Sequence, residues 1–148
     1  MVLLSAERDE WLVIIAKGEL QLIMSHAQDA YPEECCGFLL GSIDERRIQS
    51  AVSVPNTNQV SRSSRYSIDP LDLVKADEAA ERANLDLLGI YHSHPDASAL
   101  PSHIDREYAW PRYTYLIVAL ENKIVREVKA WQLADNRSMF QSEDLIII

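Results

Sequence analysis

The chain has 148 residues, 47% of them hydrophobic, and a formal net charge of −9. This length is sufficient for one domain with a buried core, and no change in composition marks a second, so we expect residues 1–148 to form a single domain. The acidic balance, with no basic cluster longer than Arg46-Arg47, argues against a nucleic-acid partner.

The N-terminal segment carries no signal for export or membrane insertion. Residues 1–4 are too few for the apolar core of a signal peptide. The apolar stretch 11–16 follows a charged segment and is far shorter than a membrane span. Cys35 and Cys36 are neighbours, a pair that is strained when oxidised, so we expect them to stay reduced. These features predict a cytoplasmic protein.

Hydrophobic periodicity predicts an α+β fold. In chain order we expect a helix at 18–30, strands at 37–43 and 48–55, a polar loop at 56–64, a helix at 69–84, a strand at 87–94, a helix at 102–110, strands at 115–120 and 124–133, and an edge strand at 144–148.

The helix at 18–30 contains one of the four histidines. Its apolar residues recur at helical spacing and form one stripe. His26 lies beside that stripe, so we expect it to pack or to form a hydrogen bond and not to bind metal. The members of the stripe are Leu20, Ile23, Met24 and Ala27.

The helix at 69–84 has a clear start. Asp69 is a favourable N-cap, and Pro70 suits the first helical position because its missing N–H needs no partner there. Leu71, Val74 and the alanines of this helix are expected to face a core.

Two carboxylates, Glu33 and Glu34, stand where the first helix gives way to an apolar strand. Glu34 is at the entrance of the strand beside small residues, and Glu33 is expected to be more solvated. The residues alone leave open which of them is a catalytic base, or whether both are surface charges. Cys36, beside Gly37, suits a small packing residue better than a metal ligand.

His92 and His94 end the strand at 87–94 and are the strongest chemical signal in the chain. Residues two apart in a strand share a face, and at about 3.3 Å per residue both imidazoles can reach one ion. Ser93 between them points to the opposite face and is assigned no chemistry. Eleven residues after His94 comes Asp105. Two imidazoles and one carboxylate are a typical ligand set of catalytic zinc, with a fourth position left for water.

Ser102 and Asp105 have the spacing of a helix N-cap and its N3 partner. The resulting helix would end before Pro111. Asp105 would then lie in the first turn, where the helix favours negative charge. Each residue also has a purely structural interpretation, because a His-x-His pair is often a surface feature and any helix favours a serine cap and an early aspartate. Their coincidence at the end of a buried strand favours a metal site.

The combination of Glu34-Cys35-Cys36-Gly37, His92-Ser93-His94-Pro95 and Ser102-His103-Ile104-Asp105 resembles the JAMM motif of the MPN-plus zinc metallopeptidases. The segment 65–70 is similar to the family's strand before its second long helix, and 113–118 to the strand after the site. The resemblance covers roughly residues 17–148. It implies an MPN-like fold, in which helices flank a mixed β-sheet and which is related to that of the cytidine deaminases.

The resemblance also implies roles for the residues of the motif. His92, His94 and Asp105 would bind one Zn²⁺ per chain. Glu34 would be the general acid and base that activates water and protonates the leaving amine. Ser102 would stabilise the oxyanion that develops on the carbonyl.

The substrate implied is the C-terminal diglycine tail of a ubiquitin-like protein, or an adduct on it. The chain has little spare length for the insertions of eukaryotic members and is more similar to short, stand-alone prokaryotic members that process ubiquitin-like sulfur carriers. Such a tail would add as a strand beside residues 65–68, near Asn56, Arg62 and Arg65, although an ordinary mobile loop explains these three residues equally well.

Two rival functions are a catalytically silent MPN-type binding scaffold and a zinc hydrolase of another substrate, such as a deaminase. The intact five-residue motif argues against a scaffold. The absence of a Cys-x-x-Cys pair from the sequence argues against a deaminase.

Overall fold

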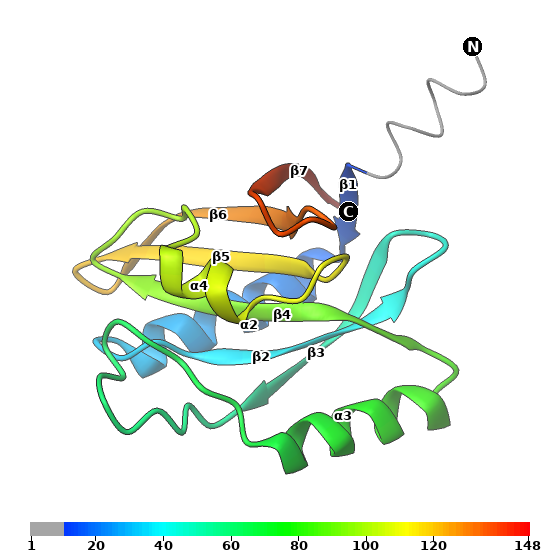
Figure 1. Ribbon diagram of the computed structural model, residues 1–148, viewed down its shortest axis with the longest axis horizontal. Helices are drawn as coiled ribbons and strands as arrows, with labels where there is room; N and C mark the ends of the chain where they lie inside the picture. The colour runs from blue at the N-terminus through cyan, green and yellow to red at the C-terminus, as the bar shows by residue number, and fades with distance from the viewer. Residues whose placement is uncertain (1–10) are drawn as a thin grey trace.

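The computed structural model describes residues 11–148, and its strands form one mixed sheet that closes on itself (Figure 1). The strands are β1 (Leu12–Ile15), β2 (Cys36–Ser42), β3 (Arg47–Val54), β4 (Asp86–Pro95), β5 (Thr114–Glu121), β6 (Ile124–Leu133) and β7 (Phe140–Ile147). The helices are α2 (Lys17–Ala30), α3 (Pro70–Arg82) and α4 (His103–Tyr108). This is the expected α+β architecture of a mixed sheet flanked by helices.

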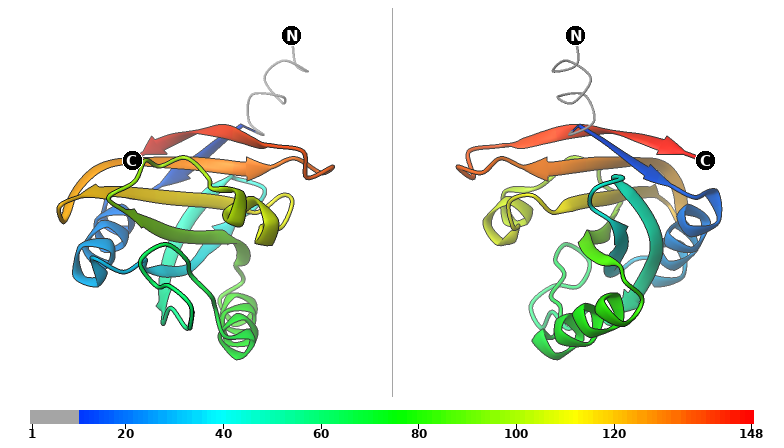
Figure 2. Two further views of the ribbon diagram at one scale, coloured as in Figure 1. Left: turned by 60° about the vertical axis from the view of Figure 1, so that its left-hand side comes forward. Right: turned by 90° about the vertical axis from the view of Figure 1, so that its right-hand side faces the viewer.

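The closure of the sheet differs from the sequence expectation. The order around the sheet is β1-β3-β2-β4-β5-β6-β7, and β7 pairs with both β6 and β1. The predicted edge strand at 144–148 is therefore an inner strand that begins four residues earlier. β1, which the sequence did not indicate as a strand, provides its second partner. Figure 2 shows both strands on the same side of the molecule.

Helices α2 and α3 pack on opposite faces of β2. Side chains alternate along a strand, so Leu39 joins the cluster beneath α2, whereas Phe38 and Leu40 join the cluster beneath α3. On β4, Tyr91 lies on the α2 side and Ile90 on the α3 side. The same alternation decides which face of β4 receives the histidines.

The structure confirms the predicted apolar stripe of α2 and the predicted start of α3. In α2 the buried residues are Leu20, Ile23 and Ala27, which belong to the predicted stripe. In α3, Asp69 is the N-cap and its side chain accepts a hydrogen bond from the backbone N–H of Leu71 at 2.9 Å.

The predicted inner face of α3 was wrong for two residues. Leu71 and Val74 are 57% and 50% exposed, and the helix contacts the sheet through Ala76 and Ala80 instead. Residues four apart share a helix face, and the two alanines allow the backbone to approach the sheet closely. Leu71 and Val74 lie on a different face of α3 for the same geometric reason.

The segment 65–68 is not a strand, contrary to the expectation taken from the family resemblance. The Ser67 carbonyl accepts a hydrogen bond from the Thr57 N–H at 2.9 Å, and the Ser67 N–H donates to Asn56 Oδ1 at 3.1 Å. The Asn56 side chain thus takes a backbone bond that a neighbouring strand would otherwise make.

A buried ion pair joins strand β7 to the turn between β2 and β3. The guanidinium of Arg46 donates to Glu143 at 2.6 Å and to Thr114 Oγ1 at 2.9 Å, and its Nε donates to the Leu12 carbonyl. Burial raises the pKa of Glu143, although Arg46 and the Thr114 hydroxyl oppose this shift. The cluster connects β1, β5, β7 and the β2–β3 turn.

Replacing Arg46 with methionine is expected to lower the free energy of unfolding by about 3–5 kcal/mol, because the buried Glu143 carboxylate loses its partner. Chemical denaturation measures this loss. The control is Arg126→Met, which breaks the exposed pair between Arg126 and Glu121 and should cost about 0–1 kcal/mol. Equal, small losses in both variants would show that the Arg46 pair contributes nothing special.

Within residues 11–148, no helix has the length and apolar character needed to cross a membrane. The apolar residues 1–4 and the charged residues that precede Trp11 lie outside the described part. The expectation that they belong to the same domain therefore stays a prediction.

Candidate metal centre

Strand β4 places both histidines on one face, as predicted. His92 and His94 are 1% and 7% exposed, and their ring centroids are 5.0 Å apart. β4 lies between β2 and β5 and is hydrogen-bonded to both, so the backbone that carries the rings is rigid. Figure 1 shows this end of β4 close to α4.

Asp105 reaches the histidines from the first turn of α4. Ser102 is the N-cap, and the predicted capping box is complete: Asp105 N donates to Ser102 Oγ at 3.0 Å, and Ser102 N donates to Asp105 Oδ2 at 2.9 Å. The Asp105 carboxylate lies 3.0 Å from His94 Nε2 and 3.9 Å from His92 Nε2. The helix cap therefore also orients the carboxylate toward both rings.

Asp105 and His94 shift each other's pKa values. Burial disfavours ionisation of Asp105, but His92, the hydrogen bond to His94 and the Ser102 N–H outweigh it and lower the pKa of Asp105 to about 2. Burial likewise disfavours the charged form of His94. Its hydrogen bonds to Asp105 and to the Ser98 carbonyl prevail, so the pKa of His94 is raised. The surroundings therefore favour a positive charge at His94 and a negative charge at Asp105.

Glu34 completes the group, and Glu33 does not. Glu34 is buried, and its Oε1 lies 3.4 Å from His92 Nδ1. Glu33 is half exposed and pairs with Arg62 at 3.3 Å. The tertiary structure therefore separates two carboxylates that the residues alone left equivalent.

The backbone around Glu34 is fixed on several sides. Its N–H donates to the Arg62 carbonyl at 2.6 Å, and its carbonyl accepts from Asn56 Nδ2 at 3.0 Å. The next N–H, that of Cys35, donates to Ser93 Oγ at 2.8 Å. Ser93, to which the sequence assigned no chemistry, thus aligns the start of β2 with β4.

The donor atoms fit a zinc ion. Glu34 Oε1 and His92 Nδ1 are buried polar atoms without a hydrogen-bond partner among the described residues, and they lie 3.4 Å from each other. His92 faces Asp105 through its other ring nitrogen, Nε2. The unpaired oxygen of Glu34 is therefore the atom that indicates a missing partner, because a buried carboxyl oxygen without one is costly. Glu34, His92 and His94 offer ligand atoms within 4.8 Å of one another. Ligand atoms about 2.0–2.1 Å from a tetrahedral zinc lie roughly 3.3 Å apart, close to the observed 3.0 and 3.9 Å between Asp105 and the two rings.

Two further residues orient the histidines, and no sequence pattern indicated either of them. His94 Nδ1 donates to the Ser98 carbonyl at 2.7 Å, which leaves Nε2 directed at Asp105, as in most metal-binding histidines. The ring of Tyr66 stacks on His92 with centroids 4.5 Å apart and planes 24° apart. Tyr66 is 26 residues from His92, so no local spacing could indicate this contact.

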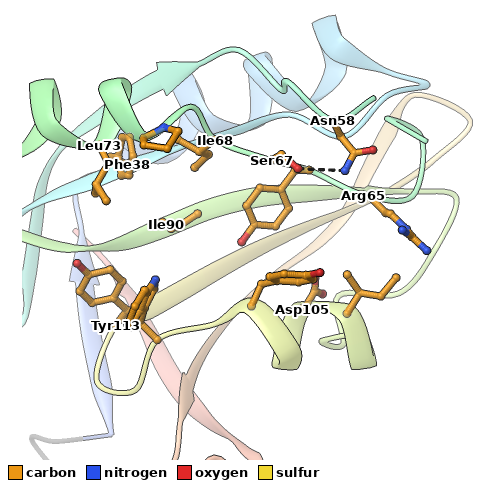
Figure 3. A pocket seen from close by; sticks show the side chains of 14 residues that line it. Phe38, Asn58, Arg65, Ser67, Ile68, Leu73, Ile90, Asp105 and Tyr113 are labelled. Carbon is orange, nitrogen blue, oxygen red and sulfur yellow. Dashed lines mark hydrogen bonds between the residues drawn. The ribbon is translucent and has the colours of Figure 1, made fainter. Parts of the chain in front are cut away.

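An elongated cavity of about 610 Å³ extends from Asp105 along the protein surface (Figure 3). Arg65, Asn58 and Asp105 lie toward one end, and Phe38 and Leu73 lie at the other. Most of the lining is apolar or aromatic, namely Phe38, Tyr66, Ile68, Pro70, Leu73, Ile90, Ile104, Tyr108, Trp110 and Tyr113. A groove of this kind suits an extended peptide with apolar side chains.

Only one of the three expected tail contacts is placed to act as one. Arg65 lines the cavity. Arg62 is paired with Glu33, and the Asn56 side chain hydrogen-bonds to the carbonyls of Glu34 and Arg65 and to two backbone N–H groups. Asn56 therefore organises the loop, which agrees with the structural alternative that the sequence left open.

The remaining candidates do not belong to the ligand group found within residues 11–148, although Cys36 is the cross-strand neighbour of His92. His26 Nδ1 forms a hydrogen bond with the Tyr91 hydroxyl at 2.8 Å, on the α2 side of β4. Cys35 and Cys36 are free and buried, and burial raises their pKa values to about 11 and about 12, which keeps both thiols protonated. Neither cysteine belongs to the ligand group among the described residues.

Comparison with known proteins agrees with this geometry. Residues 16–134 match the family described as prokaryotic homologs of the JAB domain. The chain is 40% identical over 107 residues to the desampylase of Haloferax volcanii, covering 69% of this chain and 76% of that protein. It is 37% identical over 106 residues to a probable TtuB-protein conjugate cleaving protease of Thermus thermophilus, covering 72% and 69%.

A solved structure supports the fold. The JAB1/MPN domain protein of Archaeoglobus fulgidus superposes with a TM-score of 0.59 at 20% identity, covering 92% of this chain and 99% of that one. The described residues therefore have the MPN-like fold predicted from the sequence. The chain belongs to the family of prokaryotic JAB-domain homologues and is a hydrolase of the JAMM type.

Proposed function

We infer that the protein is a zinc peptidase or isopeptidase that cleaves at the C-terminal tail of a ubiquitin-like sulfur-carrier protein. The observation that carries this proposal is the convergence of Glu34, His92, His94 and Asp105, together with an apolar groove that Asp105 also lines. The names of the two relatives, a desampylase and a TtuB-protein conjugate cleaving protease, support a protein conjugate as the substrate.

Each residue then has a separate task. His92, His94 and Asp105 hold the zinc ion, which when bound acts as a Lewis acid that polarises the scissile carbonyl and acidifies water. Glu34 accepts the proton of the attacking water and delivers it to the leaving amine. Its burial keeps bulk water from competing for that proton.

Ser102 stabilises the transition state in this proposal. Its Oγ accepts a hydrogen bond from the Asp105 N–H, so its own hydroxyl hydrogen is free to be donated to the developing oxyanion. The role in capping and the role in catalysis are therefore compatible. The apolar groove binds the tail and excludes water from the carbonyl.

Cleavage of a defined carrier conjugate tests the function. A ubiquitin-like sulfur carrier with a short C-terminal extension, and the same carrier isopeptide-linked to a lysine peptide, are incubated with the protein and their masses are measured. We expect release of the extension or the peptide, loss of cleavage with a zinc chelator, and recovery when zinc is restored. The carrier without an extension or linked peptide is the control and should keep its mass.

A binding scaffold predicts the opposite set of results. It would purify without stoichiometric zinc, bind the carrier equally well with and without chelator, and leave both conjugates intact. That outcome would contradict the proposed function.

A further inference from the structure

Helix α4 carries Asp105 and follows Ser102, and packing secures it only at its C-cap, Ala109, which is buried beside Tyr115 and Leu133. It contains six residues, none of them buried. A helix this short is unstable by itself in water. A metal ligand must nevertheless be held to within about 0.5 Å of its working position. Contacts from outside the helix must therefore fix α4.

Arg137, in the loop between β6 and β7, makes such contacts. Its Nη1 donates to the Ala109 carbonyl at 2.6 Å, and its Nη2 donates to the carbonyls of Glu107 and Arg106 at 2.9 and 3.1 Å. The last carbonyls of a helix have no partner within the helix, and a cation is favourable there because of the helix dipole. One guanidinium thus satisfies three groups at the C-terminal end of α4.

The backbone of Arg137 supports a role for its side chain. Its φ is 60°, in the left-handed region that favours glycine. This conformation is strained for a residue with a side chain. Glycine would make the same turn at lower cost, so the turn itself does not explain an arginine. The three hydrogen bonds from the side chain to α4 explain why an arginine stands here.

We propose that Arg137 is a positioning residue for the metal centre. The capping box fixes the first turn of α4, and Arg137 fixes the last, so the two together hold Asp105 in register with His92 and His94. The effect of Arg137 on zinc affinity rests on the proposed zinc site, and its effect on cleavage rests on the proposed function. Its effect on the rigidity of α4 rests on neither.

The test replaces Arg137 with glycine, which keeps the turn and removes the side chain. The matched control is Arg112→Gly. Arg112 also has a positive φ, of 72°, and forms an exposed pair at 3.3 Å with Asp135 of the same β6–β7 loop. Zinc affinity is measured by competition with a chromophoric chelator. Hydrogen exchange of the Arg106 amide, which bonds to the Ser102 carbonyl at 3.0 Å, is measured in zinc-free protein.

We expect Arg137→Gly to weaken zinc binding by about 10- to 100-fold, the usual effect of losing a group that orients a ligand. The Arg106 amide should exchange faster, while amides in β4 and β5 keep the wild-type rate. Arg112→Gly should leave zinc affinity and exchange within twofold of wild type. Arg137→Lys, which keeps the charge without the planar fork, should lie between wild type and Arg137→Gly.

Wild-type zinc affinity and wild-type exchange in Arg137→Gly would overturn the proposal. An equal loss in Arg112→Gly would also overturn it, because any disturbance of the loop would then suffice. If Arg137→Gly fails to fold, Arg137→Lys decides by the same two measurements. A wild-type protein that binds zinc but cleaves no conjugate contradicts the proposed function alone and leaves this comparison valid.

Discussion

Replacing Glu34 with glutamine is expected to reduce cleavage by about two to four orders of magnitude while zinc stays bound. The amide has nearly the shape of the carboxylate but cannot accept a proton. Glu34 is buried, with its Oε1 3.4 Å from His92 Nδ1. Single-turnover cleavage of a carrier conjugate and the zinc content of the same sample give the two quantities.

Glu33→Gln is the matched control, because it makes the same chemical change one residue away. Glu33 is half exposed and contacts only Arg62 among the ionic partners in the described residues. This variant should cleave at close to the wild-type rate. Full cleavage by Glu34→Gln, or an equal loss in Glu33→Gln, would remove Glu34 from its proposed role.

Replacing His92 with alanine is expected to abolish both zinc binding and cleavage. The substitution removes one of the three proposed protein ligands and leaves a hole beneath the Tyr66 ring. Elemental analysis should find zinc in the wild-type protein and essentially none in the variant. Zinc stabilises only a protein that binds it, so added zinc should raise the melting temperature of wild type and not that of His92→Ala.

His26→Ala provides the control for His92→Ala. His26 is a half-buried histidine that bonds to the Tyr91 hydroxyl on the other side of β4. Its loss should lower stability and leave zinc content unchanged. Zinc retained at full stoichiometry in His92→Ala would disprove the ligand assignment.

The sequence predicted the parts of the site that neighbouring residues encode. The two-residue period of a strand placed His92 and His94 on one face, and the three-residue spacing of a capping box placed Asp105 in the first turn of α4. The Asp69-Pro70 start of α3 was equally local. In each case the signal and the structure depend on the same few residues.

Glu34 marks the limit of that local information. Glu33 and Glu34 are adjacent and chemically alike, and only the packing of the 56–65 loop and β4 around the backbone of Glu34 buries one and exposes the other. The family resemblance selected Glu34 before the structure did. It misjudged the segment 65–68, where the Asn56 side chain replaces strand pairing.

By itself, the sequence determined most of the helices and strands and the shared location of His92, His94 and Asp105. Helix caps, strand alternation and residue spacing are properties of short segments. Only the tertiary structure decided that β1 and β7 close the sheet and that Leu71 is exposed. It also decided that Tyr66 stacks on His92 and that Arg137 bonds to the end of α4. These contacts join residues distant in the chain. Their energy comes from burial and hydrogen bonding that exist only after the chain has folded.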